Sequence, residues 1–132
     1  MSFSARIRKA KRVYIIGNGG SYANAAHIAN DLIGCGVRAH TLDAATLTAT
    51  ANDFGYEFVF SKWIITFGEP GDLLIALSGS GKSKNILNAV EAAKLIGMDV
   101  ECVFGAPTLD MQKAEEEQIW LGHELMRQLK CA

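Results

Sequence analysis

The chain has 132 residues, 49% of them hydrophobic, and its 13 basic and 14 acidic side chains leave a formal net charge of −1. This length suits one domain with a substantial core, so residues 1–132 are expected to form a single domain. A nearly neutral charge argues against nucleic acid as a partner, and the absence of a long apolar run argues against a membrane-spanning segment.

The amino-terminal residues and the cysteines indicate the compartment. Residues 1–11 carry charge but no apolar stretch of the kind found in secretory signals, so a cytoplasmic protein is expected. Cys35, Cys102 and Cys131 are odd in number and lack metal-ligand spacing, which favours reduced thiols over a disulfide framework. Cys102 lies in an apolar run and is expected to face the core.

Apolar runs alternate with helical segments, which is typical of an α/β domain built around a parallel sheet. Strands are expected near residues 13–16, 37–42, 73–77 and 100–104. Helices are expected near residues 21–33, 57–67, 83–96 and 110–129. Gly34 and Gly97 are placed as carboxyl-terminal caps and Asp110 as an amino-terminal cap. The predicted architecture is a three-layer α/β/α sandwich with a four- to five-stranded parallel sheet, as in flavodoxin-like and Rossmann-like folds.

A glycine-rich turn follows the first predicted strand. Gly17, Gly19 and Gly20 permit a tight backbone and close approach of a ligand, and Ser21 stands where a helix should begin. The first N–H groups of that helix have no intrahelical partner, so an anion such as phosphate is the expected guest. The alternative is a tight strand-to-helix turn that Ser21 merely caps.

A second turn of the same kind lies in the stretch LLIALSGSGKSKN, residues 73–85. Ser78, Ser80 and Ser83 offer hydroxyl groups, and the helix that follows adds further N–H groups. Because the carboxyl ends of parallel strands line one crevice, both turns are expected to face the same ligand.

These turns resemble two nucleotide-binding motifs, but each lacks a glycine that its motif requires. Residues 81–83 resemble the end of a P-loop, but the position that requires glycine holds Ala76. The first turn has Tyr22 at the third glycine position of a dinucleotide fingerprint, although Asp43 could stand in for its ribose-binding acid. No nucleotide cofactor is therefore expected.

The motifs GNGGS at 17–21, NDFG at 52–55 and SGSGKS at 78–83 resemble those of the SIS (sugar isomerase) domain, in its phosphoheptose isomerase branch. The resemblance implies a phosphosugar-binding domain. It assigns phosphate contacts to Ser78, Gly79, Ser80 and Ser83. It assigns sugar contacts to Asn18, Gly19, Gly20, Ser21, Asn52 and Asp53. From the residues alone, Asp53 is equally well explained as a helix cap or turn former.

The resemblance also implies a reaction, the aldose–ketose isomerisation of a sugar phosphate such as sedoheptulose 7-phosphate. Proton transfer through an enediol needs a base and an acid. By this resemblance Asp31 is the base, although the family carries glutamate there, and His123 in the final helix is the acid. The alternatives are that His27 and Asp31 are ordinary helix residues, and that the chain is a non-catalytic phosphosugar-binding regulatory or protein-interaction module.

A zinc site and self-association complete what the resemblance implies. His27, Asp31, Glu115 and His123 would be the metal ligands, although Glu116 shares a helical face with His123 better than Glu115 does. The alternative is that the glutamate run is a solvated face. Related enzymes share active sites between subunits, so a homo-oligomer, dimer or tetramer, is expected, although the family's long amino-terminal helices and fifth strand have no counterpart in this sequence.

Overall fold

The computed structural model describes residues 1–105 and 110–131, without the side chain of Cys131, and shows a parallel sheet of four strands in this part of the chain. The strands are β1 (Val13–Ile16), β2 (Ala39–Thr41), β3 (Leu73–Ser78) and β4 (Asp99–Phe104). Their order is β2-β1-β3-β4, and Ile15 lies opposite Ile75 in the central pair. The predicted parallel sheet is thereby confirmed.

Burial follows position in the sheet. β1 and β3 are buried at every residue, as expected of inner strands that are apolar on both faces. β4 is an edge strand, and its residues are only partly covered or exposed. The prediction that Cys102 lies in the core is therefore wrong, because the thiol is exposed on this edge strand.

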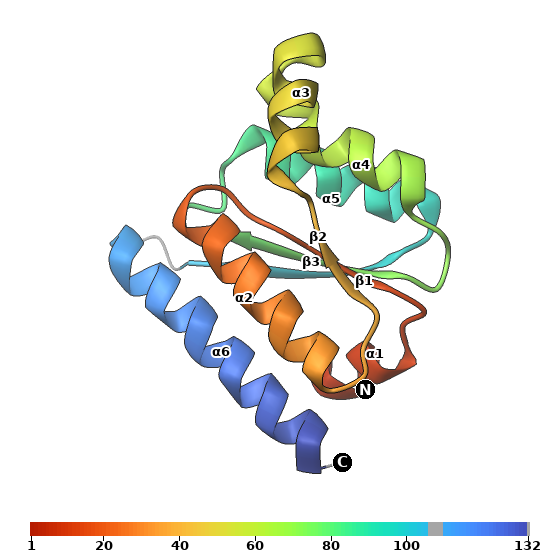
Figure 1. Cartoon of the computed structure of the whole chain (residues 1–132), viewed down its shortest axis with the longest axis vertical. Helices are drawn as coiled ribbons and strands as arrows, with labels where there is room; N and C mark the ends of the chain where they lie inside the picture. The colour runs from red at the N-terminus through yellow and green to blue at the C-terminus, as the bar shows by residue number, and fades with distance from the viewer. Residues whose placement is uncertain (106–109, 132) are drawn as a thin grey trace.

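Helices cover both faces of the sheet (Figure 1). They are α1 (Phe3–Lys9), α2 (Gly20–Gly34), α3 (Ala44–Phe54), α4 (Val59–Phe67), α5 (Lys84–Ile96) and α6 (Met111–Cys131), with a 3-10 turn, η1, at Tyr56–Phe58. The core on one face joins α1, α2 and α6 to Val13 and Ile15, and the core on the other joins α4 and α5 to Tyr14 and Ile16. The predicted three-layer sandwich is confirmed. No helix in the described residues is long and apolar enough to cross a membrane.

Two helices and one cap differ from the expectations. The sequence pattern does not predict α1, which is only seven residues long, or α3, which is rich in alanine and threonine. No residue of α3 is fully buried, although Leu47 and Ala51 pack against the core. Asp43 starts α3 by accepting a hydrogen bond from the Thr46 backbone N–H at 2.9 Å. Gly34 is the last residue of α2 rather than its cap, and the left-handed backbone follows at Gly36. Gly97 and Asp110 do cap their helices as predicted.

A buried polar network fastens α6 along α2. Gln118 Nε2 donates to Ser21 Oγ at 3.0 Å, and Asn24 Nδ2 donates to Gln118 Oε1 at 2.9 Å. Further along, Gly122 lets the helices approach, because a side chain there would overlap Ile28. The two helices run in the same direction, and this register decides which residues of α2 and α6 meet.

Arg6 ties α1 to the edge strand β4. Its Nε and Nη2 atoms donate to the two carboxylate oxygens of Asp99, both at 2.8 Å, and Nη1 donates to Glu101. This bidentate arrangement is the strong form of an arginine–carboxylate contact. It holds α1 against the β4 edge of the sheet.

We predict that Arg6→Ala lowers the free energy of unfolding by about 1 to 2 kcal/mol, measured by denaturant titration. Hydrogen bonds from Arg6 hold the pKa of the Asp99 carboxyl below its ordinary value. The pair therefore stabilises the fold at neutral pH and loses this contribution as the pH falls and Asp99 becomes protonated. The difference between wild type and variant should shrink in acid. Arg127→Ala, which breaks the exposed pair with Glu124, is the control and should change stability little. Equal losses in both variants would contradict the prediction.

Candidate functional site

The two predicted turns lie side by side at the carboxyl ends of β1 and β3. These strands are neighbours, and the chain leaves β1 toward β2 on one side and β3 toward β4 on the other. A parallel sheet opens a crevice where its connections diverge in this way. The structure thus brings together two turns that are about sixty residues apart in the sequence.

The serine turn, residues 78–83, is folded by its own hydroxyl groups. Ser78 Oγ accepts a hydrogen bond from the Gly81 N–H at 2.9 Å, and Ser80 Oγ accepts one from the Lys82 N–H at 3.1 Å. Ser83 is the N-cap of α5, but its side chain makes no capping bond. The turn thus presents serine hydroxyls and the first N–H groups of α5 on one loop, which is a suitable arrangement for a phosphate group.

The glycine turn, residues 17–21, is locked to the serine turn's helix by a pair of amides. Asn18 Nδ2 donates to Asn85 Oδ1 at 2.8 Å, and Asn85 Nδ2 donates back to Asn18 Oδ1 at 2.9 Å. The Tyr56 hydroxyl donates to the same Asn18 oxygen at 2.6 Å. Asn85 is buried, so this pair sets the spacing of the two turns. The sequence analysis does not identify Asn85 or Tyr56; the available signal for Asn85 is its place in the first turn of α5, beside the serine turn.

Ser21 lies in the interface between α2 and α6. Its side chain is buried, and its hydroxyl accepts the hydrogen bond from Gln118. It does not cap α2, because Gly19 occupies the N-cap position with a φ of 57°. Among the predicted sugar contacts of this turn, Asn18, Gly19 and Gly20 are the ones that reach the surface of the protein.

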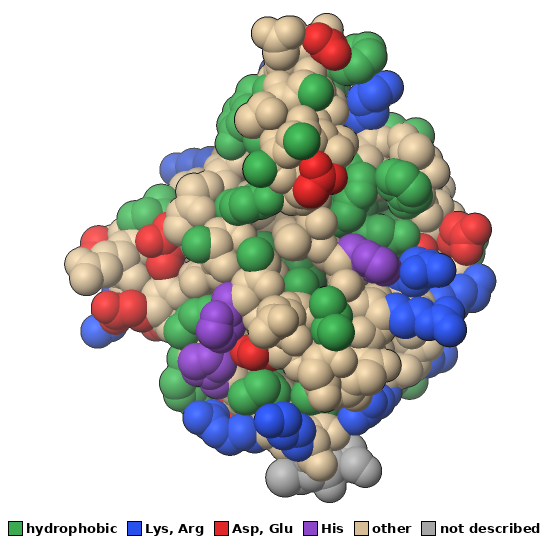
Figure 2. All heavy atoms as spheres, viewed as in Figure 1, with side chains coloured by type: hydrophobic (Ala, Val, Ile, Leu, Met, Phe, Trp, Pro, Cys, Tyr) green, Lys and Arg blue, Asp and Glu red, His purple; other side chains and the backbone are tan. Residues whose placement is uncertain are grey.

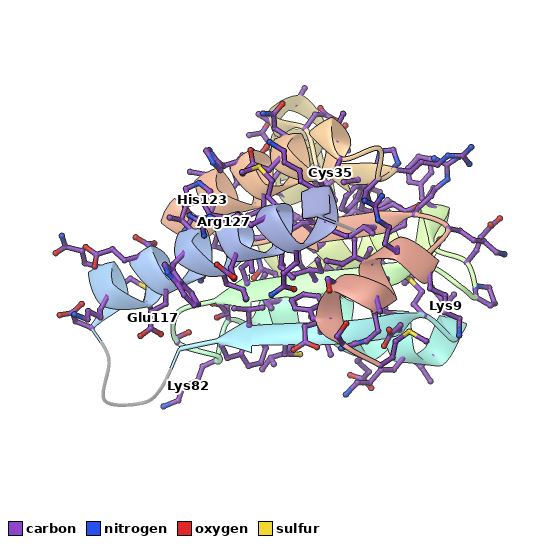
Figure 3. All side chains as sticks on the ribbon, turned by 90° about the horizontal axis from the view of Figure 1, so that it is seen from below. Lys9, Cys35, Lys82, Glu117, His123 and Arg127 are labelled. Atoms are coloured by element: carbon purple, nitrogen blue, oxygen red, sulfur yellow. The ribbon has the colours of Figure 1, made fainter. Side chains whose placement is uncertain are left out.

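The first turns of α6 lie over both loops. A side chain at Gly79 would overlap Met111, and one at Gly20 would overlap the carboxylate of Glu115. Figure 3 shows Lys82 of the serine turn and Glu117 of α6 at the same end of the molecule. The glycines are therefore needed where α6 covers the turns, as well as for the backbone conformation of the turns.

Asn52 and Asp53 lie at the far end of α3, which projects from the body of the domain in Figure 1. Both are exposed, and Asn52 Nδ2 donates to Asp53 Oδ1 at 3.1 Å. Between α3 and the glycine turn is a cavity of about 230 Å³. Its lining includes Asn18, Gly19, Tyr22, Thr48 and Tyr56. The start and middle of α3, rather than the NDFG motif at its end, thus flank the crevice.

His27, Asp31 and His123 form a compact cluster between α2 and α6. His27 Nε2 lies 3.1 Å from His123 Nε2 and 3.2 Å from Asp31 Oδ2. One ring nitrogen carries one proton and cannot bond both neighbours through it, and Asp31 Oδ2 is buried without a properly oriented hydrogen bond in the described residues. Candidate ligand atoms of the three residues all lie within 4.8 Å of one another. Two of the purple histidine side chains in Figure 2 lie side by side. The convergence of His27 and His123 with the Asp31 carboxylate forms a candidate metal-binding group.

Glu115 is not brought into this cluster. It lies eight residues before His123 on α6, which is about 12 Å along a helix, and its carboxylate lies against Gly20. Three of the four predicted metal ligands therefore meet, while the fourth lies beside the glycine turn. The exposed Glu116 is not part of the cluster either.

Known proteins resemble this chain in sequence and in fold. The family model of the SIS domain matches residues 2–105. Phosphoheptose isomerase from Rhodospirillum rubrum is 41% identical over 111 residues, covering 78% of this chain and 59% of that protein. This chain thus spans about three fifths of that relative's length.

Solved structures show the same fold. The phosphoheptose isomerase of Neisseria gonorrhoeae superposes with a TM-score of 0.90 at 29% identity, over 98% of this chain and 81% of that one. The NanR protein of Vibrio vulnificus, solved with ManNAc-6P, has a TM-score of 0.72 at 19% identity, over 96% of this chain and 51% of that one, which shows a common fold alone. With four parallel strands, two crevice turns and a family match over most of its length, this chain belongs to the SIS domain family.

Proposed function

We propose that the chain is a phosphosugar isomerase that interconverts an aldose and a ketose, with sedoheptulose 7-phosphate as the expected ketose. The observation that carries the proposal is the pair of turns that the Asn18–Asn85 contact joins at the crevice between β1 and β3. The names of the similar proteins, phosphoheptose isomerases, support the choice of reaction and substrate.

In this proposal the phosphate binds the serine turn through Ser78, Gly79, Ser80 and Ser83. Hydroxyl and backbone N–H donors there meet the amino terminus of α5, which favours an anion. The sugar hydroxyls lie toward the glycine turn, where Asn18, Gly19 and Gly20 face the crevice. Thr48 and Tyr56 flank the cavity beside the glycine turn, whereas the exposed Asn52 and Asp53 lie beyond it and are given no sugar contact in this proposal.

Proton transfer is assigned to Asp31 and His123. A base removes a proton from the carbon beside the carbonyl group, and an acid protonates the carbonyl oxygen, which gives the enediol. Both residues lie at the interface between α2 and α6. Their neighbour His27 is about 10 Å along α2 from Gly20. In a ketose 7-phosphate the reacting carbons are at the opposite end from the phosphate, which agrees with this separation.

Zinc is the proposed ion for the histidine cluster. In tetrahedral coordination at the usual zinc distances, ligand atoms lie about 3.4 Å apart, close to the 3.1 and 3.2 Å separations around His27 Nε2. His27, Asp31 and His123 would hold it. When bound, zinc would act as a Lewis acid that stabilises negative charge on the substrate oxygens.

We further propose a cytoplasmic homo-oligomer. β4 leaves one strand edge unpaired in the described residues, and large apolar side chains such as Ile65, Leu95 and Trp120 are well exposed. Both features favour association of subunits.

A second candidate is a phosphosugar-binding module without catalysis. Asp31 favours it, because aspartate reaches one methylene less than the glutamate that the related enzymes carry, and base catalysis is sensitive to small displacements. The crevice would bind the same ligand in either case, so turnover separates the two candidates.

We predict that the protein converts sedoheptulose 7-phosphate to an aldose phosphate, detected by chromatography, and is stabilised thermally by this ligand. Replacing Ser80 and Ser83 by alanine should weaken binding at least tenfold, since hydrogen bonds to a charged group are lost. Thr66→Ala, which removes an exposed hydroxyl on α4, is the control and should bind normally. Stabilisation without turnover would favour the binding module, and unchanged binding by the serine variant would contradict both candidates.

We predict that the purified protein binds one zinc ion per chain, measured by equilibrium dialysis and elemental analysis, and that His123→Asn abolishes this binding. Zinc competes with protons for both imidazoles, so its affinity should fall as the pH is lowered. His40→Asn changes a histidine outside the cluster and should leave zinc binding unaltered. Equal zinc binding by wild type and His123→Asn would show that the cluster does not hold the metal.

A further inference from the structure

A second cavity lies at the other end of the sheet from the crevice. It has a volume of about 520 Å³, within the range of small-molecule sites. Its lining residues are Arg12, Tyr14, His40, Thr41, Trp63, Phe67 and Glu69. Arg12 precedes β1 and Glu69 precedes β3, whereas the crevice residues follow these strands. We call this space the edge-strand cavity, since β2 forms one side of it.

Aromatic rings form its walls and are held in place. The Tyr14 ring, which is buried, meets Trp63 edge-on with 5.2 Å between centroids and lies 5.6 Å from His40. The Tyr14 hydroxyl donates to the Phe67 carbonyl at 3.3 Å, so it is already satisfied. Phe67 itself is 58% exposed. The rings of Tyr14, Trp63 and His40 are thus positioned by contact with one another, and Phe67 adds exposed aromatic surface.

Its polar groups are only partly paired. Arg12 Nη1 lies 3.3 Å from His40 Nε2, and since a guanidinium only donates, His40 must accept and be neutral. Burial and the Arg12 charge both lower the pKa of His40, in agreement with a neutral ring. Among the described residues, no carboxylate lies within 4 Å of Arg12, and Glu69 of the same cavity pairs with no basic group. The Thr41 hydroxyl is buried without a hydrogen-bond partner.

We propose that the edge-strand cavity binds an α-amino acid with an aromatic side chain. The Arg12 guanidinium matches a planar carboxylate. Glu69 is the partner for the ammonium group. The side chain of the ligand packs against Trp63 and Phe67, as aromatic rings prefer. This proposal does not depend on the isomerase activity, because none of these residues belongs to the crevice or the histidine cluster.

Trp63 reports on occupancy directly. The chain has two tryptophans, so Trp120→Phe leaves Trp63 as the single indole fluorophore. Titrating this variant with L-phenylalanine should give a saturable change in emission. Two probes test the charges: 3-phenylpropanoate lacks the ammonium group, and 2-phenylethylamine lacks the carboxylate. Both should bind at least tenfold more weakly than L-phenylalanine. Equal affinity for 3-phenylpropanoate, or no saturable change at millimolar L-phenylalanine, would overturn the proposal.

Single substitutions identify the groups that bind. Arg12→Gln should abolish the preference for L-phenylalanine over 2-phenylethylamine, and Glu69→Gln should abolish the preference over 3-phenylpropanoate. Lys11→Gln removes the neighbouring positive charge and is the matched control, with no expected change. If Lys11→Gln weakens binding as much as Arg12→Gln, the effect is one of general charge and the assigned contacts are wrong. Trp63 emission that changes with protein concentration alone would show a second subunit covering the cavity, which would also overturn the proposal.

Discussion

The contact between α2 and α6 decides most of the geometry of the candidate site. Gln118 reaches into the interface and bonds Ser21, while Asn24 bonds Gln118 in return. Apolar surfaces alone tolerate small shifts along a helix, whereas a buried amide needs its partner in one register. That register sets His27 beside His123 and lays the start of α6 over both turns. A slip of one turn would separate the histidines and uncover the crevice.

The groups proposed to bind the ligand and those proposed to transfer protons lie at different points along the helix α2. Its amino end, with Asn18 and Gly19, meets the serine turn and is built from hydroxyl, amide and backbone groups that suit a phosphosugar. Its middle carries His27 and Asp31, which can hold a metal ion or move a proton. One helix thereby carries both parts of the candidate site. The two candidate functions share one site because both use the same turns to bind the ligand and differ only in whether Asp31 and His123 transfer protons.

The two ends of the sheet have different chemistry. At the carboxyl ends, small residues leave the backbone accessible, and the turn serines and amides supply neutral donors. At the amino ends, Tyr14 and Trp63 build an aromatic wall beside Arg12 and Glu69. The rigid β1 strand runs through both regions, since Tyr14 and Ile16 pack into one core and only the loops around them differ. A domain of this size can thus present two separate binding surfaces.

The sequence by itself determined the features that depend on local chemistry. The buried strands β1 and β3, the glycine and serine turns and the caps at Gly97 and Asp110 are encoded within a few residues of where they act. Tertiary packing decided the rest. Asn85 and Tyr56 become partners of Asn18 only when β1 and β3 pair. Cys102 is exposed because β4 is an edge strand, and α3 is held by its Asp43 cap and by Leu47 and Ala51 against the core. The packing of α6 on α2 places His123 beside His27 and Glu115 beside Gly20. Contacts of this kind arise from the register between helices, which no local pattern in the chain contains.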